Sequence, residues 1–418
     1  NNSDDKSVFR KHLARDSLSL RRTNVKVTNT QFEMENFVFS NPVKILFGKG
    51  QIANLKDEIP AQSRILLIYG GGSIKSNGVY DQVKEALSDV FVAEFSGIEP
   101  NPHYETCLKA VEIIRSQNIN FILAVGGGSV IDATKFISAA ACFKGADSWE
   151  ILEKQAPVEE ALPFGTVLTL PATGSEMNTG AVITRASDKS KLAFASEKVY
   201  PKFSILDPSV TFSLPVKQIG NGVVDTFVHV VEQYATYPAN ALIQDYFAES
   251  VLKTLITEGP KALENPENYD VRANLMWAST WALNGWIGLG IPSDWATHAI
   301  GHELTAFYGL DHGQTLAIVL PGVLRILKEQ KAEKIIRLGE QVFGIYNNLS
   351  RDEQVEYTIQ AVESFFEEMG VKTHLSDYGL GVEAIGPIYE RLKLRGWKLG
   401  EKHNITAEVA KEILLTRL

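Results

Sequence analysis

Residues 121–132 read F-I-L-A-V-G-G-G-S-V-I-D, and this stretch decides the fold that the sequence predicts. The apolar run at 121–125 has the length and the side chains of a strand buried on both faces. Three glycines close the strand, and Ser129 stands where it can cap a helix predicted at 130–141. A strand that turns through glycines into a helix begins a βαβ unit, so we expect a parallel sheet.

The alternation of strand and helix continues on both sides of this unit. Further strands are predicted at residues 64–69, 91–95, 165–170 and 203–206, and further helices at 79–87 and 106–117. Continuous apolar strands joined by helices indicate a Rossmann-like parallel sheet covered on both faces. We place this α/β domain at residues 34–212.

Two of these strands end in G-G-G-S, at Gly70 and at Gly126. Backbone amides of such a turn can approach a phosphate closely, and the helix N-terminus adds partial positive charge. Neither turn is G-x-G-x-x-G, so a tight turn without a ligand is the alternative. Two such turns at strand ends favour a dinucleotide, because open α/β sheets bind ligands there. The turn at 69–75 has no acid and contains Lys75, which favours NADP over NAD.

A third polar turn follows the strand predicted at residues 165–170. It reads L-T-L-P-A-T-G-S-E at residues 168–176. The hydroxyl groups of Thr169, Thr173 and Ser175 are therefore candidates for hydrogen bonds to a cofactor. Turn and helix-cap chemistry without a ligand remains the alternative for these residues.

After Pro215 apolar residues recur at the helical period instead. Helices are predicted at residues 241–255, 270–286, 294–307, 315–327, 331–343, 353–369 and 406–418. Asp-Pro and Leu-Pro pairs between residues 207 and 215 mark the change. We therefore expect an all-helical domain at residues 213–418.

Four of the eight histidines lie in one stretch of this half, between residues 225 and 312, together with a carboxylate at helical spacing. Asp225 and His229 are four residues apart, as are His298 and His302, and His312 follows a turn. An i,i+4 pair lies on one helix face, so the pattern predicts a divalent-metal site. One carboxylate and three imidazoles suit Zn²⁺ or Fe²⁺, not Ca²⁺ or Mg²⁺. We assign four ligands, Asp225, His229, His298 and His312, and place His302 outside them as a proton relay or an orienting group.

The composition excludes several classes of protein. The chain has 418 residues, 44% hydrophobic and 22% charged, which is typical of globular domains. A net charge of −9 argues against a general nucleic-acid binder. No apolar run reaches the ~18 residues of a membrane span. Cys107 and Cys142 form no disulfide framework, and we expect buried thiols in a reducing, cytoplasmic compartment.

Residues 1–33 differ from the rest and are set apart as a basic N-terminal extension. Residues 1–31 hold seven Lys or Arg against three acids. Three interpretations stay open: an addition upstream of a natural start at Met34, a flexible or surface-docked arm, and a targeting segment. Asp4 and Asp5 weaken the third.

Five motifs resemble those of the iron-containing (group III) alcohol dehydrogenases. They are G-G-G-S-V-I-D-A-T-K at 126–135, L-P-A-T-G-S-E at 170–176, D-T-F-V-H-V-V-E-Q-Y at 225–234, T-H-A-I-G-H-E-L at 297–304 and D-H-G-Q-T-L-A-I-V-L-P at 311–321. The resemblance covers about residues 34–418. Segments 45–50, 69–75, 97–102 and 373–380 are similar to the NADPH-dependent aldehyde reductase and butanol dehydrogenase branch. The family resemblance implies a dehydroquinate synthase-like architecture, with an α/β nucleotide-binding domain before an all-helical metal-binding domain.

The resemblance also implies roles for individual residues. The metal ligands would be Asp225, His229, His298 and His312. Gly127, Gly128 and Ser129 would hold the pyrophosphate. The adenosine half, with its ribose and 2′-phosphate, would lie by Gly70, Gly71, Ser73 and Asn101. The nicotinamide side would lie by Thr169, Thr173 and Lys191. We also assign Asp132 and Ser175 to cofactor binding.

The predicted activity is NADP(H)-dependent interconversion of short- to medium-chain aldehydes and primary alcohols. The metal would act as a Lewis acid on the substrate oxygen, and His302 or solvent would supply the proton. A polyol dehydrogenase, a 3-dehydroquinate synthase and a non-catalytic assembly subunit are the alternatives. We expect a cytoplasmic homodimer with a small-molecule substrate. Trp286 and Trp295 are expected mainly in the core, or else as walls of the substrate pocket.

Overall fold

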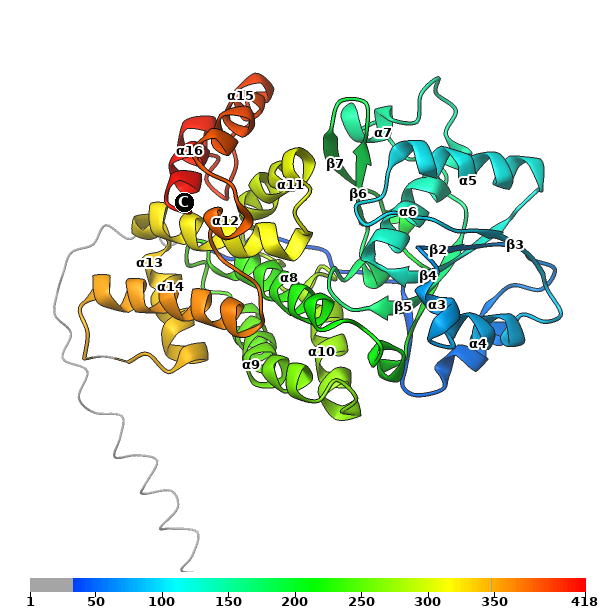
Figure 1. Cartoon of the computed structure of the whole chain (residues 1–418), viewed down its shortest axis with the longest axis horizontal. Coiled ribbons are helices and arrows are strands. Elements are labelled where there is room, and N and C mark those ends of the chain that lie inside the picture. The colour runs from blue at the N-terminus through cyan, green and yellow to red at the C-terminus, as the bar shows by residue number, and fades with distance from the viewer. Residues whose placement is uncertain (1–32, 347) are drawn as a thin grey trace, which may run out of the picture. The chain divides into compact units, whose positions relative to one another are not determined.

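The computed structural model describes residues 33–346 and 348–418, and the residues from Glu33 onward form one compact unit (Figure 1). The basic extension predicted at residues 1–33 lies, except for Glu33, outside the described residues. Among the described residues, no helix combines the length and the apolar character that crossing a bilayer requires.

A six-stranded sheet organises the first half of this unit. Its strand order is β1-β8-β5-β4-β2-β3, and every neighbouring pair is parallel. The strands are β1 (Lys44–Phe47), β2 (Arg64–Tyr69), β3 (Phe91–Phe95), β4 (Phe121–Gly127), β5 (Phe164–Leu170) and β8 (Phe203–Leu206). The parallel sheet and all five predicted strands are confirmed. β1 was not predicted, because it is a four-residue edge strand with no buried residue.

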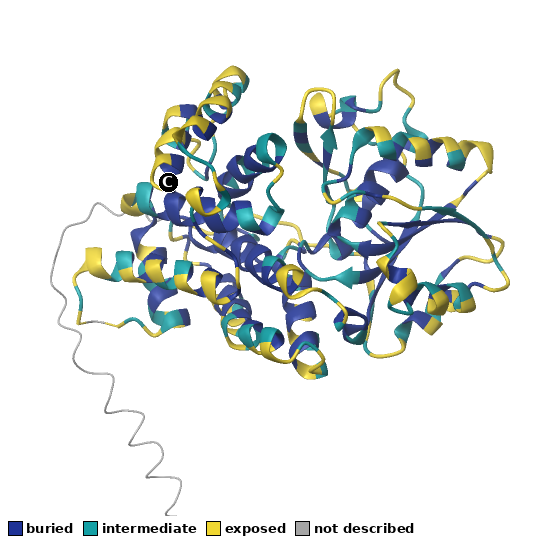
Figure 2. Cartoon of the chain, in the orientation of Figure 1, coloured by how far each residue is buried: buried dark blue, intermediate teal, exposed yellow. Residues whose placement is uncertain are grey.

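Helices cover both faces of the sheet, as the continuous apolar strands predicted. They are α2 (Leu55–Glu58), α3 (Ser73–Ser76), α4 (Val79–Ala86), α5 (Tyr104–Ser116), α6 (Gly128–Cys142) and α7 (Glu150–Glu153). Leu66 and Ile68 of β2 belong to the core with α5 and α6, while Ile65 and Leu67 belong to the core with α4. Alternate residues of one strand therefore pack in different layers, which Figure 2 shows as buried strands between helices exposed on their outer sides.

An antiparallel hairpin, β6 (Gly180–Arg185) with β7 (Ser190–Ala195), stands apart from the sheet. The sequence pattern did not predict this hairpin. Its strands contain Arg185, Ser190 and Lys191 among the apolar residues, so neither strand has the continuous apolar run that marked the sheet. The hairpin matters for the site because it carries Lys191.

The second half of the unit is helical, as predicted. Its helices are α8 (Val216–Tyr234), α9 (Leu242–Glu264), α10 (Tyr269–Ala282), α11 (Ala296–Tyr308), α12 (His312–Ile326), α13 (Lys328–Leu338), α14 (Arg351–Glu368), α15 (Ile385–Arg395) and α16 (Ala407–Leu415). α9 runs beyond the predicted end at 255, and α15 was not predicted. α10 ends before Gly285, whose φ of 90° is incompatible with helix, so the prediction to 286 was too long. The domain division at 212/213 stays a prediction within this compact unit.

α8 is the central helix of this half. Fifteen of its residues are buried, including every residue from Gly222 to Tyr234. A helix that is buried on all sides must satisfy any polar side chain that it carries. Its charged side chains are therefore the strongest candidates for a functional site.

Gly165 of β5 gives a test of sheet packing. A Cβ atom at this position would lie 2.2 Å from the ring of Phe203 on the neighbouring strand. Gly165→Ala should therefore lower the free energy of unfolding by about 1–3 kcal/mol, as overpacked cores do. Urea denaturation measures this value. The control is Gly386→Ala on α15, where the added methyl meets nothing within 4 Å. It should be neutral or stabilise by about 0.4–1 kcal/mol, and an equal loss at both positions would refute the packing argument.

Candidate metal and cofactor site

Four predicted ligands converge beside α8. Asp225 and His229 lie one turn apart on α8, His298 comes from α11, and His312 is the first residue of α12. The Oδ1 atom of Asp225 lies 3.4 Å from Nε2 of His229, 3.6 Å from Nε2 of His298 and 3.4 Å from Nε2 of His312. Nitrogen or oxygen ligands at about 2.1 Å from a tetrahedral Zn²⁺ are about 3.4 Å apart. The three separations from Asp225 are therefore compatible with ligands of one metal ion.

The hydrogen bonding of these side chains also fits a metal. Asp225 Oδ1 and His298 Nε2 are buried and have no hydrogen-bond partner. Buried polar atoms without partners are rare, because leaving one unpaired costs free energy. Among the described residues, these four form the group whose ligand atoms all lie within 4.8 Å of one another. The residues present thus suit a bound divalent metal.

The electrostatics of the cluster favour the ligating forms at most positions. Burial alone would raise the pKa of Asp225, but His229 and His312 outweigh it and hold that pKa well below its usual value. Burial lowers the pKa of His229 to about 3 and also lowers that of His312. Burial acts the same way on His298, but Glu232 and Asp225 overcome it and raise its pKa to about 9. The cluster therefore contains an ionised carboxylate and neutral imidazoles, the forms that bind metals, while His298 must first lose a proton.

His302 lies next to this cluster and outside it. Its ring centroid is 5.6 Å from that of His312 and 6.2 Å from that of His298. Burial and the positive charge of Lys191 hold its pKa well below the usual value. The ring of Trp295 lies 5.5 Å from that of His298, whereas Trp286 packs against Phe39, Phe247 and Trp281. Trp295 is therefore the tryptophan placed to wall the site.

The two glycine turns lie side by side, because β2 and β4 are neighbours in the sheet. At Gly128 a Cβ atom would lie 2.4 Å from Oγ1 of Thr173, so glycine is needed where the turn after β4 meets the polar turn after β5. The prediction that Ser129 caps the helix is wrong. α6 begins at Gly128, and the Ser129 hydroxyl instead accepts a hydrogen bond from the Asn101 amide at 3.3 Å.

Three predicted cofactor residues form a continuous chain of contacts. Beyond the Ser129 contact, Oδ1 of Asn101 accepts a hydrogen bond from Nζ of Lys191 at 2.8 Å. Asn101 was expected near the adenosine half and Lys191 near the nicotinamide side. The two side chains are in contact, and their roles toward the cofactor stay predictions. Burial lowers the pKa of Lys191 to about 8, and the negative charge of Asp225 opposes this shift. Lys191 is thus close to both the cofactor turns and the metal cluster.

Asp132, Thr173 and Ser175 hold the third turn in place. Asp132 accepts hydrogen bonds from the Ser175 hydroxyl at 2.6 Å and from the Val182 amide at 2.9 Å. Oγ1 of Thr173 accepts a hydrogen bond from the backbone amide of Ser175 at 3.1 Å. These contacts show a structural role for each residue, and their direct contact with a cofactor stays a prediction, as it does for Thr169, which is half-buried at the end of β5.

The turn after β2 opens to a pocket of about 350 Å³. It is lined by Tyr69, Gly70, Gly71, Gly72, Lys75, Ser96 and Gly97. Lys75 extends over the rings of Tyr69 and Tyr80, with its ammonium 5.5 and 5.0 Å from their centroids. Ser73 begins α3 at the edge of this turn. The pocket contains one cation and no carboxylate among its lining residues, so it suits an anionic group.

The polar turn after β5 packs directly on the turn of α8 that carries Asp225. The hydroxyl of Thr226, next to Asp225, donates to the Ala172 carbonyl at 3.3 Å. A Cβ atom at Gly222 would lie 2.7 Å from the Pro171 carbonyl oxygen. The polar turn after β5 therefore connects the glycine turn after β4 to the metal cluster. It meets Gly128 through Thr173 and α8 through Ala172.

Comparison with known proteins agrees with this site. A family model for iron-containing alcohol dehydrogenase matches residues 42–208, and one for the C-terminal part of the Fe-containing alcohol dehydrogenase family matches residues 220–391. The chain belongs to the iron-containing alcohol dehydrogenase family. The resemblance and the two-part α/β and helical architecture are thereby confirmed.

Individual relatives are similar over nearly their whole length. The NADPH-dependent aldehyde reductase YqhD of Escherichia coli is 54% identical over 91% of this chain and 99% of its own. The probable NADH-dependent butanol dehydrogenase 1 of Bacillus subtilis is 41% identical over 92% of this chain and 100% of its own. The crystal structure of Escherichia coli YqhD superposes with a TM-score of 0.91 at 53% identity, covering 93% of this chain and 100% of that one.

Sequence reasoning missed one residue of the site, Glu232. Its carboxylate contacts the ring of the ligand His298. The signal was present in the sequence, because Glu232 lies three residues after His229 and seven after Asp225, and so on the same helix face.

Metal binding can be tested without any substrate. Zn²⁺ added to chelator-treated protein should raise its melting temperature, because the metal binds only the folded chain. At 100 times the Kd the stabilisation is about 2.7 kcal/mol. In Asp225→Ala this rise should be lost, as differential scanning fluorimetry will show.

The matched control for this experiment is Asp245→Asn. It also alters a buried carboxylate, paired with Lys334 on another face of the helical half. It should lower the melting temperature of the metal-free protein but keep the Zn²⁺-induced rise. An unchanged rise in Asp225→Ala would contradict the assignment of this ligand.

Proposed function

We propose that this protein is a metal-dependent, NADP(H)-dependent alcohol dehydrogenase that reduces short- to medium-chain aldehydes to primary alcohols, and catalyses the reverse. The observation that carries the proposal is the convergence of Asp225, His229, His298 and His312 beside the turns of a dinucleotide-type sheet. The proposal is supported by the family and by the YqhD relative, whose name describes an NADPH-dependent aldehyde reductase.

Reduction adds a hydride to the carbonyl carbon and a proton to its oxygen, giving a primary alcohol and NADP⁺. When bound, the metal supplies a Lewis acid for the substrate oxygen and NADPH supplies the hydride. Asp225 and the three histidines would hold the metal as Zn²⁺ or Fe²⁺. Trp295, whose ring lies 5.5 Å from that of His298, would help to exclude water from that side of the cluster. His302, outside the ligand set, is placed to pass a proton from one of its ring nitrogens.

We assign the cofactor to the turns at the carboxyl ends of β2, β4 and β5. Gly127, Gly128 and Ser129 would bind the pyrophosphate through their backbone amides. The adenosine side would occupy the pocket of Gly70, Gly71 and Ser73. Lys75 favours the 2′-phosphate of NADP there. The Bacillus subtilis relative is named a probable NADH-dependent enzyme, so kinetics with both cofactors are needed.

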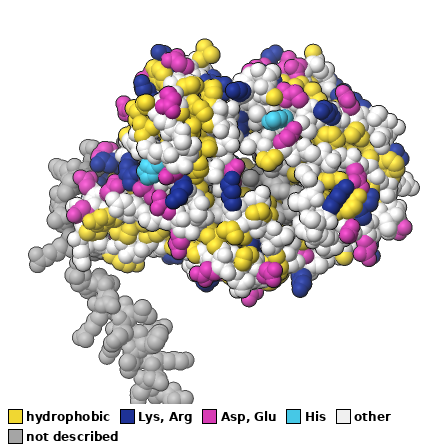
Figure 3. Space-filling model, in the orientation of Figure 1, with side chains coloured by type: hydrophobic (Ala, Val, Ile, Leu, Met, Phe, Trp, Pro, Cys, Tyr) yellow, Lys and Arg dark blue, Asp and Glu magenta, His cyan; other side chains and the backbone are white. Residues whose placement is uncertain are grey.

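A second copy of the chain is the proposed partner, and the cytoplasm the proposed location. β1 is an edge strand, and the segment leading to it exposes large apolar side chains: Met34, Phe37, Val38 and Phe39, followed by Phe47. Exposed apolar edges favour association. The free thiols Cys107 and Cys142 suit a reducing compartment. On the face shown in Figure 3, acidic and basic side chains are interspersed, which does not favour nucleic acid.

Steady-state kinetics test the activity and the cofactor together. The wild type should reduce butanal with a higher kcat/KM for NADPH than for NADH. Lys75→Ala should reduce this preference about 10-fold, which corresponds to about 1.4 kcal/mol and to the loss of one charge-assisted hydrogen bond. Lys84→Ala, which removes a partly exposed cation of the neighbouring helix α4, should leave the preference unchanged.

Three outcomes would contradict these proposals. Butanal reduction that survives in Asp225→Ala would exclude the metal chemistry. Faster oxidation of glycerol than of butanol, or turnover of a phosphorylated sugar acid, would favour the polyol dehydrogenase or the synthase. A preserved NADPH preference in Lys75→Ala would move the 2′-phosphate elsewhere.

Light scattering tests the homodimer. The mass should be twice 46.1 kDa, and Val38→Lys should shift the equilibrium toward monomer, because Val38 is 93% exposed in the single chain. Leu394→Lys is the matched control, since Leu394 is 89% exposed but lies on α15, away from the β1 edge. A dimer weakened equally by both changes would exclude this edge.

A further inference from the structure

Glu232 is a buried acid on the same helix face as two of the metal ligands. It lies on α8 three residues after His229 and seven after Asp225, and its side chain is 2% exposed. A buried carboxylate without partners would be strongly destabilising. The contacts of the Glu232 carboxylate therefore indicate its role.

Both oxygens of the Glu232 carboxylate bind the first turns of α11. Oε2 contacts Nδ1 of His298, and Oε1 accepts a hydrogen bond from the Thr297 amide at 2.6 Å. The backbone carbonyl of Glu232 also accepts a hydrogen bond from the backbone amide of Asp294 at 2.9 Å. One residue of α8 thus holds the chain at three points between residues 294 and 298.

These contacts determine how the His298 ring is used. An ionised carboxylate only accepts hydrogen bonds, so Nδ1 of His298 must carry the proton that it shares with Glu232. Nε2 of the same ring lies 3.6 Å from Oδ1 of Asp225 and has no hydrogen-bond partner. The neutral ring therefore directs a lone pair at the metal cluster.

We propose that Glu232 is a positioning residue that fixes the ring orientation and the tautomer of His298 for metal binding. This inference rests on the metal site of the proposed function. Glu232 itself is outside the group of four ligands, so it acts on the metal through His298 alone.

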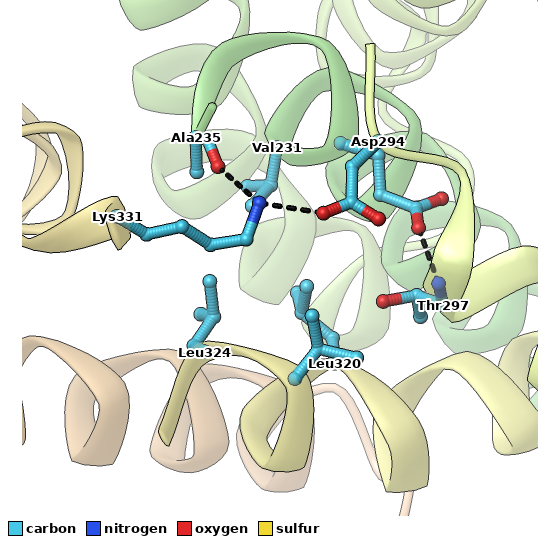
Figure 4. Close-up of a pocket in the computed structure, with 9 residues that line it drawn as sticks. Val231, Ala235, Asp294, Thr297, Leu320, Leu324 and Lys331 are labelled. Atoms are coloured by element: carbon cyan, nitrogen blue, oxygen red, sulfur yellow. Dashed lines mark hydrogen bonds and ion pairs between the residues drawn. The ribbon is translucent and has the colours of Figure 1, made fainter. Parts of the chain in front are cut away.

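A buried ion pair supports the same turn from its other side (Figure 4). Lys331 of α13 is 1% exposed, and its ammonium lies 2.5 Å from Asp294, 2.8 Å from Glu401 and 2.9 Å from the Ala235 carbonyl. The second oxygen of Asp294 accepts the Ala296 amide at 2.7 Å, at the start of α11. The segment from 294 to 298 is therefore held by Lys331 at Asp294 and by Glu232 along its whole length.

Lys331 and Glu232 line the same small cavity, which also includes Leu320, Val323 and Leu324. The hydrogen bonds and ion pairs of the Lys331 ammonium go to Asp294, Glu401 and Ala235, whereas those of the Glu232 carboxylate go to His298 and Thr297. A change at Glu232 therefore leaves the Lys331 ion pairs intact. This separation makes Glu232 suitable for substitution.

The test is the Zn²⁺ affinity of Glu232→Gln, measured by competition with a chromogenic chelator in the absence of substrate. Glutamine has the same shape but can no longer accept from both the His298 ring and the Thr297 amide. The dissociation constant should rise about 10- to 100-fold, as is usual when the outer partner of a ligating histidine is lost. Co²⁺ substitution adds a second readout, because a displaced imidazole changes the visible absorption of the tetrahedral ion.

Glu249→Gln is the matched control. Glu249 is equally buried in the helical half and accepts hydrogen bonds from Tyr234 and Arg337. It should lower stability but leave the Zn²⁺ dissociation constant within about 3-fold of the wild type. Equal weakening in both variants would mean a general loss of structure and would overturn the proposal.

Glu232→Asp separates position from charge, and it replaces Glu232→Gln if that variant does not fold. It keeps the carboxylate but withdraws it by one methylene, so Zn²⁺ should again bind more weakly than to the wild type. Wild-type affinity in Glu232→Asp would overturn the positioning role. Asp225→Ala separates the two hypotheses. If Asp225→Ala binds Zn²⁺ with wild-type affinity, the metal site itself is wrong. If Asp225→Ala loses Zn²⁺ binding while Glu232→Gln keeps wild-type affinity, only the role of Glu232 is overturned.

Discussion

The charge of Asp225 is the constraint on which the helical half depends. A carboxylate in the middle of a fully buried helix is far too costly to leave unpaired. The structure brings His229, His298 and His312 within 3.6 Å of its Oδ1 atom, so a divalent metal held by these four side chains would offset this cost. Two of these rings come from α11 and α12, so those helices must dock on α8 in one register. Packing and metal chemistry therefore impose the same arrangement.

α8 also joins the two halves of the molecule. The residues around Asp225 are small on the side facing the turn after β5: Gly222 meets Pro171, and Thr226 binds Ala172. The same turn meets Gly128 through Thr173. A cofactor held by the glycine turns and a metal held by α8 would thus be positioned by a single set of contacts. The third point of attachment is Lys191, whose hairpin brings a cation toward both sites.

The sequence predicted the features that local patterns mark. The sheet strands were continuous apolar runs, and Asp225 and His229 lay four residues apart, so both followed from helix and strand geometry. It did not predict β1, a four-residue edge strand with no buried residue, or the β6–β7 hairpin, whose strands mix apolar and polar residues. The cap assigned to Ser129 failed because a tertiary contact with Asn101 took its hydroxyl. Glu232 was overlooked because its partner, His298, is distant in sequence.

The ligands of the metal cluster are far apart along the chain, which bears on how the protein is made. Asp225 and His229 are synthesised well before His298, and His312 comes later still. During synthesis the pair on α8 can offer only an incomplete coordination shell, because the remaining imidazoles are not yet available. Stable metal acquisition must therefore wait until α12 has left the ribosome and docked, so the ion enters as one of the last steps of folding.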